Sequence, residues 1–218
     1  MSDKYTGKGM DRRYSGQAVD ITYNLPRCIH AEECVHRLAE VFDTNRRPWI
    51  NPDGTTSDRV AQVVTLCPSG ALHYESKDEV EIAPETNTVT LWHNGPLQFA
   101  GDLRIEGSSV DVQQETRATL CRCGSSHNKP FCDNSHNQID FNGAAAEGIT
   151  AVPINEGGGL KITVLPNGPL GIEGTFTLYD EQGIALFSGR KAALCRCGGS
   201  SKRPFCDGSH IGNGFTGE

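Results

Sequence analysis

The stretch CRCGSSHNKPFCDNSH, residues 121–136, returns as CRCGGSSKRPFCDGSH, residues 195–210. Both copies have the pattern Cys-x-Cys-x8-Cys-x3-His, which offers three thiolates and one imidazole. Thiolate sulfur suits iron-sulfur clusters, and imidazole is also a ligand of iron. Four donors match a 2Fe-2S unit, which takes two protein ligands on each iron. The candidate ligands are Cys121, Cys123, Cys132 and His136 in the first copy and Cys195, Cys197, Cys206 and His210 in the second.

The spacing within each copy predicts how the donors divide between two irons. A Cys-x-Cys pair in extended chain can reach one iron. Cys132 and His136, like Cys206 and His210, are four residues apart, so one helical turn would bring them to the other iron. Acidic residues follow the third cysteine of each copy and suit the positive end of that turn, namely Asp133 and Asp207.

A larger repeat surrounds these motifs. Asn94-Gly95-Pro96-Leu97 returns at residues 167–170 and Leu120 returns as Leu194, offsets of 73 and 74 residues. Nearly equal offsets indicate one duplicated unit, residues 88–142 and 160–216, joined by a linker over 147–159. In both units, short runs of strand-forming residues are separated by turn-forming residues, which predicts short strands. These strands are expected at 103–105 and 109–112, and at 175–179 and 184–187.

The repeated motif resembles the CDGSH iron-sulfur domain, because residues 206–210 spell Cys-Asp-Gly-Ser-His and the serine and proline positions also fit. The first copy departs from the family at Asn134, where glycine is usual. Asparagine tolerates a left-handed backbone well, so we expect this site to assemble with lower stability. The resemblance implies a 2Fe-2S cluster held by three cysteines and one histidine. It also implies two domains paired around a two-fold axis under a β-cap, here within one chain and therefore in a monomer.

Zinc is the alternative occupant, since three cysteines and one histidine are a common structural zinc set. Zinc ligand pairs are usually separated by two to four residues, so the one-residue gap of Cys-x-Cys is less suited to a single tetrahedral ion. Two other histidines of this region, His93 and His127, lie outside the shared pattern and are read as surface groups.

The preceding region predicts a different domain. Residues 1–18 are polar and dotted with glycine, which is typical of a mobile tail, and residues 19–80 read as a compact α+β unit. Strands are expected at 19–25 and 71–74. Helices are expected at 31–43 and from a Ser57 cap to Leu66.

Three cysteines in this region, Cys28, Cys34 and Cys67, suggest a third cluster. Ala31 occupies the position of the second cysteine of a bacterial ferredoxin run. Residues 19–80 resemble the divergent mono-cluster ferredoxin family through Cys-x-His-x3-Cys and a distant Cys-Pro-Ser-Gly-Ala-Leu. The resemblance implies a 3Fe-4S cluster, or a 4Fe-4S cluster whose fourth iron takes His30, water or a partner's ligand. The alternative is a ferredoxin-like fold that holds no cluster.

Composition narrows the class of protein. The net charge of −7 argues against nucleic acid as a partner, and we find no apolar run long enough to span a bilayer. Nine cysteines in 218 residues fall below the roughly 8–10% typical of disulfide scaffolds. We therefore expect a cytoplasmic protein of α+β class: a small ferredoxin-like α/β domain followed by two β-rich CDGSH domains in an intrachain pseudo-two-fold pair.

We find no Ser-His-Asp signature, no phosphate-binding loop and no dinucleotide-binding glycines in the sequence. The expected function therefore rests on the predicted clusters. We expect electron transfer with a redox partner rather than enzymatic activity. A cluster donor to an apo-acceptor, a redox or pH sensor, and a structural zinc module are the alternatives. Basic residues inside the motifs could offset cluster charge or guide an acidic partner, or be ordinary solvated surface; they are Arg122, Arg196, Lys129, Lys202 and Arg203.

Overall fold

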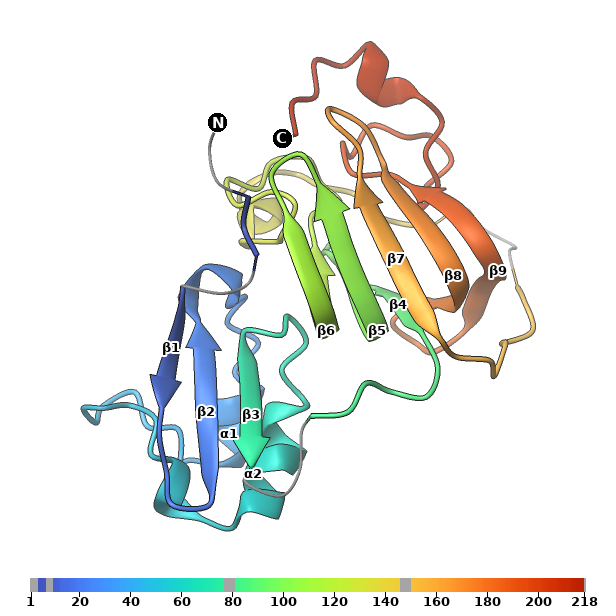
Figure 1. Ribbon diagram of the computed structural model, residues 1–218. Helices are drawn as coiled ribbons and strands as arrows, with labels where there is room; N and C mark the ends of the chain where they lie inside the picture. The colour runs from blue at the N-terminus through green and yellow to red at the C-terminus, as the bar shows by residue number, and fades with distance from the viewer. Residues whose placement is uncertain (1–3, 7–9, 77–80, 146–149, 218) are drawn as a thin grey trace. The chain divides into compact units, whose positions relative to one another are not determined.

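The computed structural model describes residues 4–6, 10–76, 81–145 and 150–217. The chain divides into two compact units, Lys8–Ile82 and Met1–Gly7 with Ala83–Glu218 (Figure 1). Strands dominate, and the helices are few and short. Within the described residues, none of the helices combines the length and the apolar character needed to cross a bilayer.

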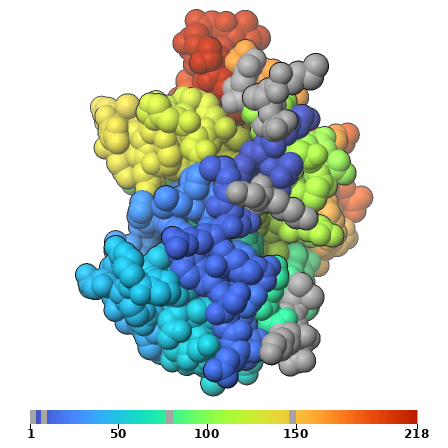
Figure 2. Space-filling view, turned by 60° about the vertical axis from the view of Figure 1, so that its left-hand side comes forward, coloured from blue at the N-terminus to red at the C-terminus, as the bar shows by residue number. Residues whose placement is uncertain are grey.

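The N-terminal unit is a three-stranded antiparallel sheet in the order β1-β2-β3, with two helices packed on it. Val60, Val63 and Val64 of the second helix are fully buried and form a core with Ile21 and Phe42. The edge strand β1 is mostly exposed, and the chain around it lies at the surface shown in Figure 2. The elements are β1 (Asp11–Tyr14), β2 (Val19–Asn24), η1 (Leu25–Arg27), α1 (Glu33–Arg37), η2 (Pro52–Gly54), α2 (Ser57–Val64) and β3 (Leu72–Ser76).

Three sequence expectations for this unit need correction. Part of the tail predicted over residues 1–18 is strand β1, because it pairs with β2 in register from Asp11 opposite Asn24. The helix predicted over 31–43 shrinks to α1, since Glu32 has a left-handed backbone and Leu38 leaves the helical region. The cap of α2 is Thr56 rather than Ser57, because the Thr56 hydroxyl accepts the N–H of Arg59.

The C-terminal unit holds both copies of the repeat in one six-stranded sheet. Its strands are longer than the sequence predicted, because Gly101 in β5 and Gly174 in β8 lie at register shifts that interrupt the alternation. The strands are β4 (Thr88–Leu91), β5 (Leu97–Gly107), β6 (Asp111–Leu120), β7 (Gly159–Val164), β8 (Leu170–Tyr179) and β9 (Ala185–Leu194).

The two copies exchange strand pairings. Strands β4, β5 and β6 belong to the first copy, and β7, β8 and β9 are their equivalents in the second. Each copy pairs its own strands antiparallel, while β5 pairs parallel with β7 and β4 pairs parallel with β8. The copies therefore share one sheet and one core and form a single compact unit. The segment predicted as a linker, 147–159, lies partly outside the described residues.

A buried asparagine ties this shared sheet together. The Asn87 amide donates to the carbonyls of Gly158 and Thr175, and its carbonyl oxygen accepts the N–H of Asp102. Gly101, at a register shift in β5, has a φ of 152°, and a Cβ there would lie 2.0 Å from Asn87 Oδ1. Only glycine therefore allows the strand to bend around this side chain.

Candidate metal centres

The donors of the first copy lie in two pairs, just beyond the end of β6. Cys121 Sγ is 3.8 Å from Cys123 Sγ, and Cys132 Sγ is 3.5 Å from His136 Nδ1. Cys121 and Cys132 are buried, while Cys123 is half-buried. The Cys-x-Cys pair is anchored by backbone bonds, because the N–H of Cys121 donates to the carbonyl of Pro130.

The second copy repeats this arrangement beyond β9. Cys195 Sγ and Cys197 Sγ are 3.7 Å apart, and Cys206 Sγ and His210 Nδ1 are 3.4 Å apart. Its outer pair is more accessible, since Cys206 is half-buried whereas its counterpart in the first copy is buried.

These distances fit two tetrahedral metal ions in each copy. Two sulfurs bound at about 2.3 Å to one tetrahedral ion lie about 3.8 Å apart, and a sulfur and a nitrogen bound at about 2.3 and 2.0 Å lie about 3.5 Å apart. Among the described residues, no three His, Cys, Asp or Glu side chains gather closely enough for one ion. Each copy therefore offers two separate pairs of donors.

The turn that carries the second pair differs from the predicted helical turn. Residues Ser135–Gln138 form the short helix η3, and Asn134 before it has a left-handed φ of 68°. Cys132 therefore lies outside the helix, and the left-handed residue, rather than helical rise, brings it to His136. In the second copy, Gly208 has a φ of 89° before η4, Ser209–Ile211. Asn134 thus uses the left-handed backbone that asparagine tolerates, while the lower stability expected of the first site stays a prediction.

An aspartate in each copy fixes this turn. Asp133 accepts the N–H and the hydroxyl of Ser135 and the N–H of His127. Burial opposes ionisation, but the hydrogen bonds from Ser135 and His127 prevail and lower the pKa of Asp133 to about 2. Asp207 makes the same contacts in the second copy, and the Ser209 hydroxyl foremost holds its pKa well below the usual range.

The thiols differ in acidity before any metal binds. A hydrogen bond from the Cys121 thiol lowers the pKa of Cys123 to about 7, whereas burial raises the pKa of Cys132 to about 12. Backbone N–H groups also point at the sulfurs, from Asn134 to Cys132 and from Ser125 to Cys123, both at 3.4 Å. Such donors stabilise thiolate, so a metal can bind these cysteines with release of protons.

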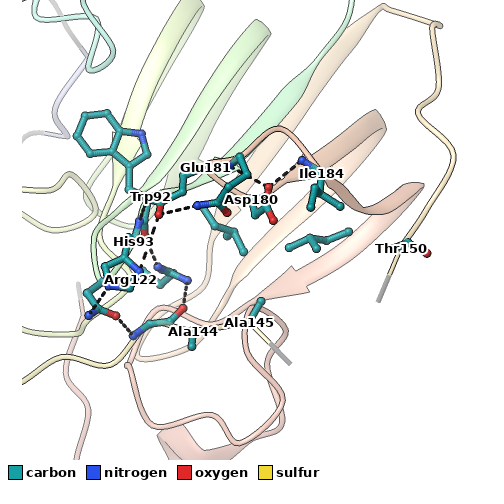
Figure 3. A pocket seen from close by; sticks show the side chains of 14 residues that line it. Trp92, His93, Arg122, Ala144, Ala145, Thr150, Asp180, Glu181 and Ile184 are labelled. Carbon is teal, nitrogen blue, oxygen red and sulfur yellow. Dashed lines mark hydrogen bonds and ion pairs between the residues drawn. The ribbon is translucent and has the colours of Figure 1, made fainter. Parts of the chain in front are cut away.

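The arginine between the first two cysteines is a buried clamp, which sequence reasoning missed. Arg122 donates to the carbonyls of Trp92, Gly95 and Gly143 and lies 5.5 Å from the ring centre of Phe141. Figure 3 shows it between the chain at Trp92 and the chain at Ala144, beside a pocket of about 390 Å³. Burial, and then the charge of Arg203, lowers its pKa to about 10, so it stays charged at neutral pH.

Arg196 makes the equivalent clamp in the second copy, with the carbonyls of Leu165, Gly168 and Gly217. Both arginines are 1% exposed, which excludes the solvated-surface and partner-guiding interpretations for them. Their charges act on thiols of both copies, because Arg122 interacts with Cys123 and Cys195. The repeated Asn-Gly-Pro-Leu segment, which sequence reasoning used only to find the repeat, is the turn that these clamps hold.

The two motifs touch each other at their second cysteines. Cys123 and Cys197 form an antiparallel bridge. The glycines that follow have positive φ, and a Cβ on Gly124 would lie 2.7 Å from the Cys197 carbonyl oxygen. Gly198 lies just as close to Cys123. Glycine is therefore required for the two copies to approach.

The remaining candidates are peripheral. Lys129 donates to the carbonyl of Ser126, and Arg203 donates to that of Gly198. Lys202 is exposed. His93 and His127 are 71% and 87% exposed, as expected of surface groups.

In the N-terminal unit, the three cysteines line one small cavity of about 40 Å³. Burial, and then the neighbouring Cys67, raises the pKa of Cys34 to about 11. The described residues that line this cavity do not include His30, which is exposed and has a φ of 53°. The structure thus brings Cys28, Cys34 and Cys67 together without the histidine.

Two residues contact these cysteines without having been predicted from the sequence. The Tyr23 hydroxyl hydrogen-bonds to Cys28, and burial foremost raises the pKa of this tyrosine. Ser69 lies with its hydroxyl 3.6 Å from Cys67 Sγ. Tyr23 arises from a strand with no motif, so only folding could show its contact.

Comparison with known families agrees with this geometry. Residues 14–77 match the family described as "Divergent 4Fe-4S mono-cluster", and residues 94–137 and 167–211 match "Iron-binding zinc finger CDGSH type". The chain is a tandem CDGSH protein with an N-terminal divergent mono-cluster domain. Iron-sulfur cluster binding is thus a property of its families.

Two relatives of this tandem CDGSH protein are each named "Uncharacterized protein YjdI", from Escherichia coli strain K12 and from Escherichia coli O157:H7. Both are 39% identical over 66 residues, which is 30% of this chain and 87% of the relative. No solved structure matches the chain.

The clamp leads to a prediction. Arg122→Lys should lower the free energy of unfolding by about 3 kcal/mol, because one ammonium cannot reach three buried carbonyls and two are left unpaired. Urea unfolding followed by near-ultraviolet circular dichroism measures this. Lys202→Arg, at an exposed position, is the control and should change stability by less than about 0.5 kcal/mol. Equal effects of the two substitutions would show that Arg122 is not a clamp.

Proposed function

We propose that this tandem CDGSH protein is a one-electron carrier with two 2Fe-2S clusters and a third, N-terminal cluster. One observation carries the proposal: in both copies a sulfur–sulfur pair and a sulfur–nitrogen pair have the spacing of ligands on one tetrahedral iron. Each CDGSH cluster then has two thiolates on one iron, and a thiolate and an imidazole on the other. Zinc is less well supported, since one ion cannot use both pairs as they lie.

The exchange of strands supports a pseudo-two-fold pair of domains within one chain. The β5–β7 and β4–β8 pairings are equivalent under exchange of the copies, and so are the close approaches of Gly124 and Gly198. A protein paired with itself in this way has no need of a second subunit, so we expect a monomer. The contact of Cys123 with Cys197 gives electrons a short path between the two clusters.

The protein tunes these clusters through charge and hydrogen bonds. One imidazole ligand places the potential between that of an all-thiolate cluster and that of a two-histidine Rieske centre. The buried Arg122 and Arg196 charges, and the N–H groups directed at sulfur, favour the reduced cluster, which carries one more negative charge.

The N-terminal site suits a 3Fe-4S cluster, or a 4Fe-4S cluster with one iron not bound by cysteine. Cys28, Cys34 and Cys67 line one cavity, while no three donors among the described residues converge on a single ion. The cavity lining gives no support to His30 as the fourth ligand. We propose that the unliganded corner takes water or a partner's ligand.

The partner is proposed to be a redox protein. We expect the tandem CDGSH protein in the cytoplasm, where a reducing environment keeps cysteines available as metal ligands. The side chains that the fold brings together are cluster ligands, so we propose a role for the protein in cluster chemistry rather than in an enzymatic reaction of its own.

Cluster content tests the proposal directly. Anaerobically purified protein should contain two irons and two sulfides for each CDGSH copy, silent in EPR when oxidised and paramagnetic after one-electron reduction. Cys206→Ser should remove one 2Fe-2S cluster, and Cys28→Ser should remove the N-terminal cluster alone. A colourless protein with stoichiometric zinc, prepared with ample iron and sulfide, contradicts the proposal.

Acid should release the CDGSH clusters. A histidine binds iron through its lone pair, so protonation competes with the bond as the pH falls toward about 6. Burial, and then the charge of Arg122, lowers the pKa of His136, which keeps this imidazole neutral to lower pH. Because Cys206 is more exposed than Cys132, we expect acid to release the second cluster first, although Asn134 is expected to lower the stability of the first site.

Visible absorbance between pH 7 and pH 5 measures this loss. His210→Cys should retain the second cluster at a pH where the wild type has lost half of it, because a thiolate replaces the imidazole. His127→Asn, which changes an exposed histidine of the first copy, should behave as wild type. Equal acid sensitivity of His210→Cys and wild type would contradict a histidine ligand.

A cluster donor is the second candidate, favoured by the more exposed outer ligands of the second copy. A carrier should keep its iron and sulfide through repeated cycles of reduction and oxidation. A donor should pass iron and sulfide to apo-ferredoxin, which is measured by separating the two proteins and assaying iron. If apo-ferredoxin acquires its cluster from this protein faster than from free iron and sulfide, the protein is a cluster donor.

A further inference from the structure

A pocket of about 410 Å³ opens on the helix-covered side of the N-terminal sheet. Its lining includes aromatic side chains, Tyr14, Tyr23 and Trp49, together with the exposed Leu25. The Tyr23 and Trp49 rings meet edge to face with centroids 5.0 Å apart. Apolar and aromatic walls of this kind are typical of small-molecule sites.

A charged residue lies in this pocket on the strand that closes it. Arg12 of β1 is directly opposite Tyr23 of β2, so both side chains project from the same face of the sheet. Its neighbour Arg13 projects from the other face and is paired with Asp20 and Glu75 at 2.7 and 2.6 Å. Arg12 lines the pocket instead.

Arg12 is exposed, and its charge lies beside a tyrosine ring. Its guanidinium carbon lies 5.4 Å from the centre of the buried Tyr14 ring, and in the described part of the chain it makes no ion pair. The other ionisable groups at the pocket, apart from tyrosines and cysteines, are His30 and Glu32. Glu32 is engaged with His36 at 3.5 Å. A guanidinium that makes no ion pair keeps a fork of N–H donors, which matches a carboxylate.

The floor of the pocket is the cysteine site. Cys28 and Cys34 line both this pocket and the small cavity that holds all three N-terminal cysteines, whereas Cys67 lines the cavity alone. A molecule in the pocket therefore covers two of the three cysteines from solvent.

We propose that this pocket binds a small aromatic monocarboxylate, with its carboxylate on Arg12 and its ring against Tyr23 and Trp49. The bound molecule lies over Cys28 and Cys34 and controls access of solvent to that site. Arg12 and the aromatic walls form the binding site in this chain whether or not a cluster is present.

Benzoate is a suitable probe, with the neutral benzamide as its isostere. Titration calorimetry on the full chain should show benzoate binding, with benzamide about tenfold weaker because it lacks the charge for Arg12. Arg12→Gln should weaken benzoate binding about tenfold. Arg13→Gln, the matched change on the opposite face, should leave it unchanged. In the NMR spectrum, the indole N–H signal of Trp49 should shift when benzoate binds. The signal is assigned by its loss in Trp49→Phe.

Iron and sulfide are counted in the same samples, and binding is repeated with Cys67→Ser, which removes a cysteine outside the pocket. Benzoate binding by protein whose iron does not exceed that of the two CDGSH clusters supports the pocket and counts against the third cluster. Iron in excess of those two clusters without benzoate binding does the reverse. Absence of binding, equal affinity of Arg12→Gln and wild type, or an unmoved Trp49 signal overturns the proposal and leaves Arg12 as a charge that protects an edge strand.

Discussion

The CDGSH half of this protein depends on a buried positive charge in each copy that is hydrogen-bonded by backbone carbonyl oxygens. Arg122 and Arg196 each join three separate parts of their copy: the Asn-Gly-Pro-Leu turn, the Cys-x-Cys strand and the chain that follows the histidine. A guanidinium at 1% exposure is costly unless its donors are hydrogen-bonded and a negative charge lies near. Each arginine donates to three carbonyls, but Nη1 of Arg196 has no hydrogen-bond partner among the described residues. Neighbouring thiolates provide that charge, so metal binding and the fold support each other.

The same constraint explains why the two copies form one unit. Each Cys-x-Cys strand passes so close to the other that a side chain at Gly124 or Gly198 would collide with the opposite backbone. The pairings of β4 with β8 and of β5 with β7 hold the two copies at this distance. Asn87 adds a hydrogen bond from the first copy to Thr175 of the second. Ligand geometry in one copy is therefore not independent of the other, and the arginine charges reach thiols on both sides.

Much of the candidate site could be predicted because metal ligation needs particular atoms at particular spacings. The Cys-x-Cys-x8-Cys-x3-His pattern identified both donor sets, and the left-handed residue Asn134 was predicted from its chemistry. Arg122 could not be interpreted in the same way, since a basic residue inside a motif looks the same whether it is solvated or buried. The helix predicted over 31–43 failed because apolar spacing does not show the left-handed turn at Glu32.

The sequence by itself determined the local chemistry: which residues offer thiolate and imidazole donors, that one motif occurs twice, and that the N-terminal cysteines belong to a separate unit. These properties depend on residue type and on separation along the chain. Only the tertiary structure decided that β4 and β5 pair with strands of the other copy, that Tyr23 reaches Cys28, and that Arg12 faces a pocket. These are contacts between distant segments, and their energies depend on packing and burial that no local pattern specifies.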